Sequence, residues 1–379
     1  MQVSVVIVSY KVPYHLSLCL GSLQLALRGI EAEIIVVDNN SQDETSQLIS
    51  RYYPEVKYIQ NNENVGFSRA NNIAIKHAKG EYICLVNPDT VVGSQTIKNA
   101  INKHKSIDNC GILGVRLIDG TGNFLPESKI NQLNLRIAIL KLLGFSKSYY
   151  NNAIKETGEG FTATLVGAFM CFKASDYNKT EGLDENYFMY GEDIDLSFQF
   201  IKAGLKNYYY GKQTIIHFKG ESTLKDKIYF QRFFDSVKLY FKKHYTNSKI
   251  MIGIASVFFV LAKYFKKNQM LKVNNRINKF HEAFVVSKSK NLLKPLEDQY
   301  KRKVSHLDYT NAKQTDFKET LVIFDPGKEH FDEVIDIMSK NRYCDNIFRI
   351  NVPQHNVLIG SDSSTSQGEV IKLKADSNH

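Results

Sequence analysis

The stretch VSVVIVSYKVPYHLSLCLGSLQLALRGIEAEIIVVD, residues 3–38, decides the fold class. It opens with residues 3–8, an apolar run of strand length. Leucines then recur at helical spacing and predict a helix over 14–27, and a second apolar strand over 33–37 ends at Asp38. Strand, helix and strand in this order predict a parallel or mixed sheet that helices cover on both faces.

The same alternation continues along the chain. Further strands are expected over residues 56–59 and 82–86, and a helix over 67–79. A polar residue stands at or just after the end of each strand, and ligands of such sheets bind beyond the carboxyl ends of the strands. The sequence therefore predicts a ligand site at this edge. The polar residues concerned are Ser9, Asp38, Asn61 and Asp89.

The composition is that of an ordinary globular protein. The 379 residues are 43% hydrophobic and 23% charged, which excludes a disordered or collagen-like chain. The five cysteines form no CxxC pair, which favours a reducing compartment. Because the first residues also lack the features of a signal peptide, we expect a cytoplasmic protein.

The net charge of +10 is concentrated in one segment. Residues 242–303 hold 15 Lys or Arg and three acids, a net charge of +12. No nucleic-acid motif accompanies this charge, so no nucleic-acid partner is expected. The segment contains a 13-residue uncharged run, 250–262, which is too short for a bilayer core that requires about 20 helical residues. It predicts either a helix lying on an anionic membrane surface, which we favour, or a solvated basic connector.

Asp89 and His217 are candidate metal ligands. Asp89 ends a strand in the turn Asn87-Pro88-Asp89, where a carboxylate facing the ligand edge is suited to Mg²⁺ or Mn²⁺. The same triplet is also good turn chemistry without a ligand. His217 ends a strand after Thr214-Ile-Ile, and it is either a second metal or phosphate ligand or a structural histidine.

Three further features suggest a nucleotide and a general base. Asp38 is either an acceptor for a ribose or base or a helix cap, and we expect it to be free because its neighbours can supply the cap. Gly66 and Arg69 are suited to a phosphate. Three acids, Glu192, Asp193 and Asp195, follow an aromatic run at an expected helix start, which indicates either a tuned general base or simple compensation of the helix dipole.

Seven motifs together resemble family-2 glycosyltransferases of the GT-A fold, especially the rhamnosyltransferase-like branch. They cover about residues 1–225 in the family's order. The stretches are VVIVSY at 5–10, VVDNNSQDET at 36–45, NVGFSRANN at 64–72, LVNPDT at 85–90, VGAFM at 166–170, LDENYFMYGEDIDLSFQ at 183–199 and HFKGEST at 217–223.

The resemblance implies a role for each matching residue. Asp38 would bind the base and ribose, and Asp89 would bind the metal in a DXD-like motif whose first acidic position is Asn87 here. Asp193, beside Glu192, would be the catalytic base, and His217 would lie near the metal and diphosphate. The nucleotide-sugar site is expected to comprise Ser9, Tyr10, Asp38, Asn40, Gly66, Arg69, Asn72 and Asn87.

The expected protein is thus an inverting, metal-dependent glycosyltransferase, with dTDP-rhamnose as the first donor to test and a saccharide or lipid-linked acceptor. A sugar nucleotidylyltransferase and a non-catalytic carbohydrate-binding protein are the alternatives. We expect a GT-A domain at 1–240, a basic helical membrane-associating segment at 241–310 and a small α/β region at 311–379. The protein is expected to lie on the inner face of the cytoplasmic membrane.

Overall fold

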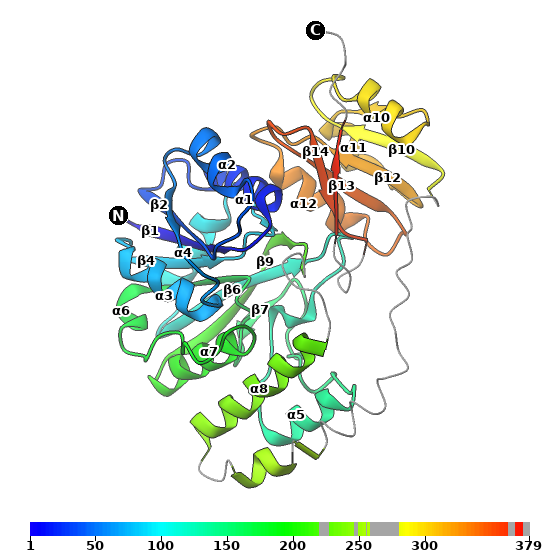
Figure 1. Cartoon of the computed structure of the whole chain (residues 1–379). Coiled ribbons are helices and arrows are strands. Elements are labelled where there is room, and N and C mark those ends of the chain that lie inside the picture. The colour runs from blue at the N-terminus through cyan, green and yellow to red at the C-terminus, as the bar shows by residue number, and fades with distance from the viewer. Residues whose placement is uncertain (220–226, 246–248, 255, 258–279, 363–367, 374–379) are drawn as a thin grey trace.

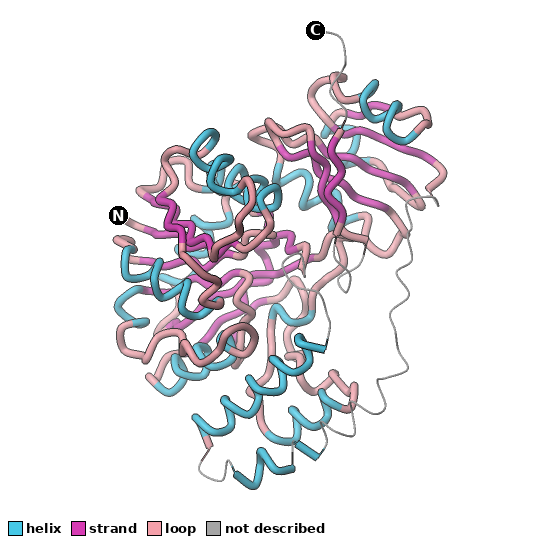
Figure 2. Tube along the Cα trace, viewed as in Figure 1, coloured by secondary structure: helices cyan, strands magenta, loops and turns pink. Residues whose placement is uncertain are grey.

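The structure is a computed structural model that describes the chain except for residues 220–226, 246–248, 255, 258–279, 363–367 and 374–379. Its described residues form two sheets and a group of helices beside the larger sheet (Figures 1 and 2). The helices of the first 244 residues are α1 (Pro13–Ala26), α2 (Thr45–Tyr52), α3 (Phe67–His77), α4 (Thr96–Lys105), α5 (Leu135–Leu142), α6 (Ala174–Tyr177), α7 (Glu192–Lys202) and α8 (Lys227–His244), with a short 3₁₀ turn at Pro126–Ser128.

The larger sheet is mixed and has the strand order β3-β2-β1-β4-β8-β6-β9-β5, with β7 paired to β9. Strands β1 to β4 are parallel, so their carboxyl ends meet at one edge. The strands are β1 (Val3–Ser9), β2 (Ala32–Asp38), β3 (Lys57–Gln60), β4 (Tyr82–Val86), β5 (Thr90–Val91), β6 (Cys110–Ile118), β7 (Glu159–Phe161), β8 (Phe169–Lys173) and β9 (Lys206–His217).

Both faces of this sheet are covered, as the sequence predicts. Alternate residues of β1 point to opposite faces, so that Val5 and Ile7 pack with α1, α2 and α4, whereas Val6 and Val8 pack with α3 and α7. Strands buried on both faces read as continuous apolar runs, which explains VSVVIVS.

A second, six-stranded sheet has the order β11-β10-β12-β13-β14-β15. Its first strand in the sequence begins at Glu282. The boundary expected at residue 311 is therefore too late, because it leaves out a strand, a helix and a second strand of this unit. The chain from 282 to 307 is part of this sheet because the apolar run of β10 pairs in parallel with β12. Its elements are β10 (Glu282–Val286), α10 (Leu293–Tyr300), β11 (Ser305–Leu307), α11 (Tyr309–Gln314), β12 (Thr320–Phe324), α12 (Phe331–Lys340), β13 (Ile347–Val352), β14 (Val357–Gly360) and β15 (Glu369–Lys372).

Helices α5 and α8 lie beside the larger sheet (Figure 1). Val237, Tyr240 and Phe241 of α8 share a buried cluster with Ala138 of α5 and Ile194 of α7. No described helix is long and apolar enough to cross a membrane. Residues 255 and 258–262 of the apolar run 250–262, which we interpreted as a surface helix, lie outside the described residues.

Candidate functional site

The predicted polar edge forms where β1, β2 and β4 end. Ser9 lies opposite Asp38 in the parallel register, and the Asn61 amide donates to the Asp38 carbonyl at 2.9 Å. The Ser9 hydroxyl is fully buried and has no hydrogen-bond partner among the described residues. Because buried hydroxyls are nearly always hydrogen-bonded, this atom marks the edge as a place for a bound group or water.

Asp38 is not free, contrary to the sequence expectation. Its side chain accepts hydrogen bonds from the Ser41 hydroxyl, from the Ser41 amide at 3.3 Å and from the Tyr58 hydroxyl at 3.1 Å. Thr45 begins α2 four residues after Ser41. The reason for the error is therefore local: Asp38 closes the turn after β2 instead of leaving that work to its neighbours.

Asp89 and His217 are brought together by strand pairing. Thr90 is the register partner of His217 in the antiparallel pair β5–β9, and the Phe218 amide donates to the Asp89 carbonyl at 3.0 Å. The Asp89 carboxylate then lies 3.3 Å from His217 Nε2, and both side chains are buried. Burial alone would raise the pKa of Asp89, but the His217 and His15 imidazoles more than offset it, so the pKa of Asp89 is lowered and the carboxylate is ionised.

These side chains fit a divalent cation. The Asn87 amide group lies 3.4 Å from His217 Nε2, while Asn87 Oδ1 and His217 Nδ1 are buried without a partner among the described residues. A carboxylate, an amide oxygen and an imidazole are suitable donors for Mn²⁺ or Mg²⁺. The described residues contain no group of three or more His, Cys, Asp or Glu that could hold a metal by themselves.

Glu127 is a site neighbour that sequence reasoning missed. It is half-buried near His217 and is paired with Lys219. Burial opposes its ionisation, but the Lys219 ammonium lowers the pKa of Glu127. Glu127 stands in an irregular part of the chain without periodicity, so no sequence signal identified it.

Glu192 and Asp193 open α7 after Gly191. Asp193 accepts from the Gly167 amide at 3.2 Å, and the Asn87 amide donates to the adjacent Ala168 carbonyl at 3.1 Å. One short segment therefore links the acids of α7 to the Asn87-Pro88-Asp89 turn. Burial raises the pKa of Asp193, and burial together with the nearby Asp193 charge raises the pKa of Glu192. A carboxylate whose basicity is raised in this way is suited to accept a proton.

Asp195, the third acid, does not belong to the site. It is fully buried and accepts hydrogen bonds from Lys243 at 3.1 Å and His244 at 2.6 Å. Gln199, one helical turn later, donates to it at 2.6 Å. Asp195 therefore joins α7 to α8.

The remaining predicted residues divide into two groups. Gly66 has a φ of 86°, and a Cβ there would lie 2.6 Å from the Phe188 carbonyl oxygen, so glycine permits the close approach of two loops. Tyr10 and Asn40 are partly exposed where β1 and β2 end. Arg69, however, lies 3.8 Å from Glu185 in an exposed ion pair. The Asn72 side-chain amide donates to the Leu183 carbonyl and to Glu185, and its oxygen accepts from the Tyr177 hydroxyl. Arg69 and Asn72 thus brace the loop at 183–185, a use that their motif does not reveal.

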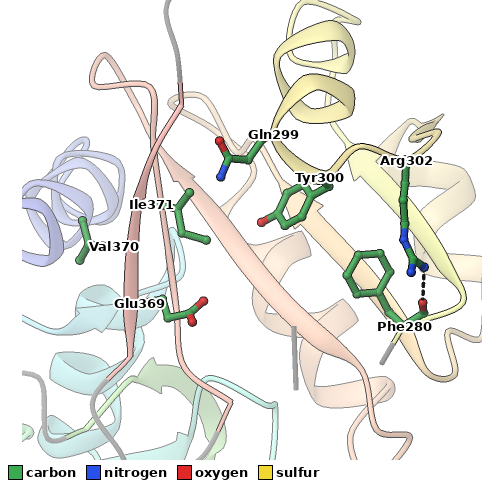
Figure 3. A pocket seen from close by; sticks show the side chains of 7 residues that line it. All are labelled: Phe280, Gln299, Tyr300, Arg302, Glu369, Val370 and Ile371. Atoms are coloured by element: carbon green, nitrogen blue, oxygen red, sulfur yellow. Dashed lines mark hydrogen bonds between the residues drawn. The ribbon is translucent and has the colours of Figure 1, made fainter. Parts of the chain in front are cut away.

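A pocket of about 460 Å³ lies elsewhere, on the second sheet between α10 and β15 (Figure 3). None of the predicted site residues lines it. Its one acid, Glu369, is paired with Arg349 at 2.9 Å. The pocket therefore offers no reactive pair comparable to Asp89 and His217.

The first part of the chain is similar to known proteins. Residues 4–175 match the family described as Glycosyl transferase family 2. The chain is 28% identical over 239 residues to the N-acetylglucosaminyl-diphospho-decaprenol L-rhamnosyltransferase of Mycobacterium tuberculosis, an alignment covering 59% of this chain and 78% of that protein. It is 25% identical over 199 residues to the rhamnosyltransferase WbbL of Escherichia coli, covering 48% of this chain and 72% of that protein.

Among solved structures, the chain is similar to the mannosyltransferase PcManGT of Pyrobaculum calidifontis in complex with GDP-Man and Mn²⁺. The identity is 16%, the TM-score is 0.46, and the match covers 71% of this chain and 76% of that one.

Proposed function

We propose that this chain, whose residues 4–175 match the family described as Glycosyl transferase family 2, is a glycosyltransferase of the GT-A fold. It transfers a sugar from a nucleotide-diphosphate donor in a metal-dependent, inverting reaction. One observation carries the proposal. The Asp89–His217 pair and Asp193 lie on either side of one segment, 167–168, which hydrogen-bonds both the Asn87 turn and Asp193. One short segment therefore joins a candidate cation site to a basic carboxylate.

The two halves of the site have complementary tasks. Asp89 and His217, with the Asn87 amide oxygen, would hold a divalent cation, which stabilises the negative charge that develops on the leaving diphosphate. Asp193 would accept the proton of the acceptor hydroxyl as this oxygen attacks the anomeric carbon. A single displacement from the face opposite the diphosphate inverts the anomeric configuration, and it requires no second nucleophilic carboxylate.

The proposed donor and acceptor follow from the relatives. The two rhamnosyltransferases align over about half or more of this chain, so dTDP-rhamnose is the first donor to test. One of them is named for a saccharide carried on a diphospho-decaprenol. We therefore propose a lipid-linked saccharide as the acceptor and surface polysaccharide synthesis as the process.

A lipid-linked acceptor requires access to a membrane surface. In the described part of the run 250–262, Ile250, Ile254 and Val257 are exposed, whereas Met251 and Ile252 pack against the cluster of α5 and α8. Exposed aliphatic side chains among basic residues favour an anionic interface. We infer peripheral binding at the cytoplasmic face, through this helical region.

A donor screen tests the proposed function. The protein is incubated with Mn²⁺ or Mg²⁺, a set of nucleotide-sugars and an acceptor panel, and release of nucleoside diphosphate is measured. Release from at least one donor is expected. Pyrophosphate release from a nucleoside triphosphate and a sugar phosphate would instead identify a nucleotidylyltransferase. Binding without release from any donor would indicate a carbohydrate-binding protein.

A further inference from the structure

The Asp89–His217 pair depends on the shortest strand of the larger sheet. β5 is two residues long, follows Asp89 directly and lies at the end of the strand order, where it pairs only with β9. Edge strands this short make few ladder hydrogen bonds and hold their position poorly without support. Something other than the sheet must therefore fix the residues around Asp89.

The support comes from the second sheet and its helix α12. Val91, Ile216 and Phe218 flank the Asp89–His217 pair along β5 and β9, and each is at most 1% exposed. They belong to a buried cluster whose other members come mainly from the second sheet and its helices, more than 200 residues after β5 in the sequence. The cluster members from α12 are Phe331, Val334, Ile335, Ile337 and Met338.

One polar contact ties α12 to the turn after β5. The Ser94 amide donates to both carboxylate oxygens of Asp332, at 3.1 and 3.0 Å. A Cβ on the neighbouring Gly93 would lie 2.3 Å from Asp332 Oδ1. Because glycine has no Cβ, the Asp332 carboxylate can lie directly against the backbone at Gly93.

We propose that the C-terminal α/β unit, residues 280–373, positions the Asp89–His217 pair for metal-dependent nucleotide binding, and that Asp332 is the positioning residue that fastens it to β5. This inference rests on the proposed function. Metal and diphosphate ligands must be held to within about 0.5 Å to act together, and β5 is too short to provide that accuracy alone. The unit thus completes the catalytic domain, although it contributes no ligand.

The test uses the full-length chain and a panel of dTDP, UDP and GDP. Calorimetry measures the affinity of the best binder with and without Mn²⁺. Asp332→Ala is expected to lower the Mn²⁺-dependent affinity about 3- to 10-fold, the typical effect of one lost hydrogen bond, and to leave metal-free affinity unchanged. Asp332→Asn keeps an acceptor oxygen and should retain most of the metal effect. Gly93→Ala, whose methyl group displaces the carboxylate from the other side, should match Asp332→Ala.

Glu333→Ala is the matched control, because Glu333 is also in the first turn of α12 but faces Lys313 and His330. It should preserve the full metal effect. A wild-type chain that binds none of the nucleotides would overturn the proposed function and this inference with it. If the wild type shows a metal effect that Asp332→Ala and Gly93→Ala both retain, only the positioning role is wrong. An equal loss with and without Mn²⁺ would also contradict it, since a general structural defect has that signature.

Discussion

At the scale of single residues, two environments give the carboxylates of the site opposite character. The imidazoles beside Asp89 lower its pKa despite burial. Among the described residues no cationic side chain is paired with Asp193, and burial raises its pKa. Groups whose pKa values are moved apart within one site are suited to different tasks. Asp89 is suited to binding a cation, and Asp193 is suited to proton transfer.

Replacing Asp193 with Asn is expected to reduce turnover by about 10²- to 10⁴-fold, because the amide cannot accept the acceptor's proton. The Gly167 amide can still donate to the remaining side-chain oxygen, so nucleotide binding should change little. Steady-state kinetics and nucleoside diphosphate calorimetry check the two expectations. Turnover at the wild-type level would remove Asp193 from the mechanism.

The pH dependence of turnover should report the raised pKa of Asp193. Only the ionised carboxylate accepts a proton, so kcat should fall on acidification at a pH above the ordinary Asp value of about 3.9. Glu192 is adjacent and also has a raised pKa. The pH profile should therefore be measured in Glu192→Gln, so that the acidic decrease in kcat reports the titration of Asp193 alone. In this variant, a decrease in kcat centred at the ordinary Asp pKa would contradict the role of Asp193 as the base.

Asp89→Ala should abolish most of the increase in nucleoside diphosphate affinity that Mn²⁺ provides. Losing a group that only orients a ligand typically costs about 10- to 100-fold in metal affinity, so loss of a ligand should cost at least as much. Calorimetry with and without Mn²⁺ measures the increment, and metal-free binding serves as the reference. An unchanged increment would show that Asp89 is not a ligand.

At the scale of elements, a buried charge cluster joins α7 to α8. Asp195 is fully buried, and Lys243 lies within 3.1 Å of the Glu181, Asp184 and Asp195 carboxylates. Burial alone would lower the pKa of Lys243, but these acids raise it. The Lys243 charge is therefore neutralised within the protein and is not available to a membrane.

Asp195→Ala should lower the free energy of unfolding by about 3–5 kcal/mol, because it leaves Lys243 and His244 buried without their shared partner. Asp235→Ala is the control: Asp235 is exposed on α8, where its carboxylate forms a surface pair with Lys238 at 3.5 Å and accepts from Gln231 at 3.0 Å. Its effect should stay within about 1 kcal/mol. Urea denaturation measures both. Equal effects for the two variants would mean that the buried cluster adds nothing to α8 docking.

At the scale of the whole molecule, the C-terminal unit is packed tightly against the first domain. Leu18 of α1 and Ile118 of β6 are buried in the same cluster as Phe324 and Phe348 of the second sheet. The Ser17 hydroxyl lies 2.8 Å from His355 Nε2. A chain truncated before residue 280 would expose this apolar surface, so membrane binding is better tested with substitutions in the intact chain.

The triple variant Ile250→Ser, Ile254→Ser and Val257→Ser should bind acidic vesicles less than the wild type does. Each removed methylene forgoes about 0.8 kcal/mol of membrane burial. Wild-type binding should also weaken as salt rises, because charges separated by more than about 8–10 Å are screened at physiological ionic strength. Vesicle sedimentation with acidic and neutral lipid provides the measurement. Tyr343→Ser, which removes an exposed hydrophobic side chain elsewhere on the surface, is the control. Equal sedimentation of the variant and the wild type would exclude this surface.

The sequence by itself determined the larger sheet and the edge of that sheet at which the candidate site lies. Apolar strands such as residues 3–8 are read from local periodicity, and parallel strands must end at one edge. Motif spacing also indicated Asp89, His217 and Asp193, which the fold brings to one region.

Only the tertiary structure decided how other residues are used. Asp38 bonds Tyr58 across the β2–β3 pair, Asp195 turns toward α8, and residues 282–307 join the second sheet. Each outcome depends on which distant segments pack together. The same acid at a helix start can face a ligand or a lysine, and the same apolar run can lie on a membrane or pair with a strand. Local pattern is identical in both cases, so long-range contacts alone distinguish them.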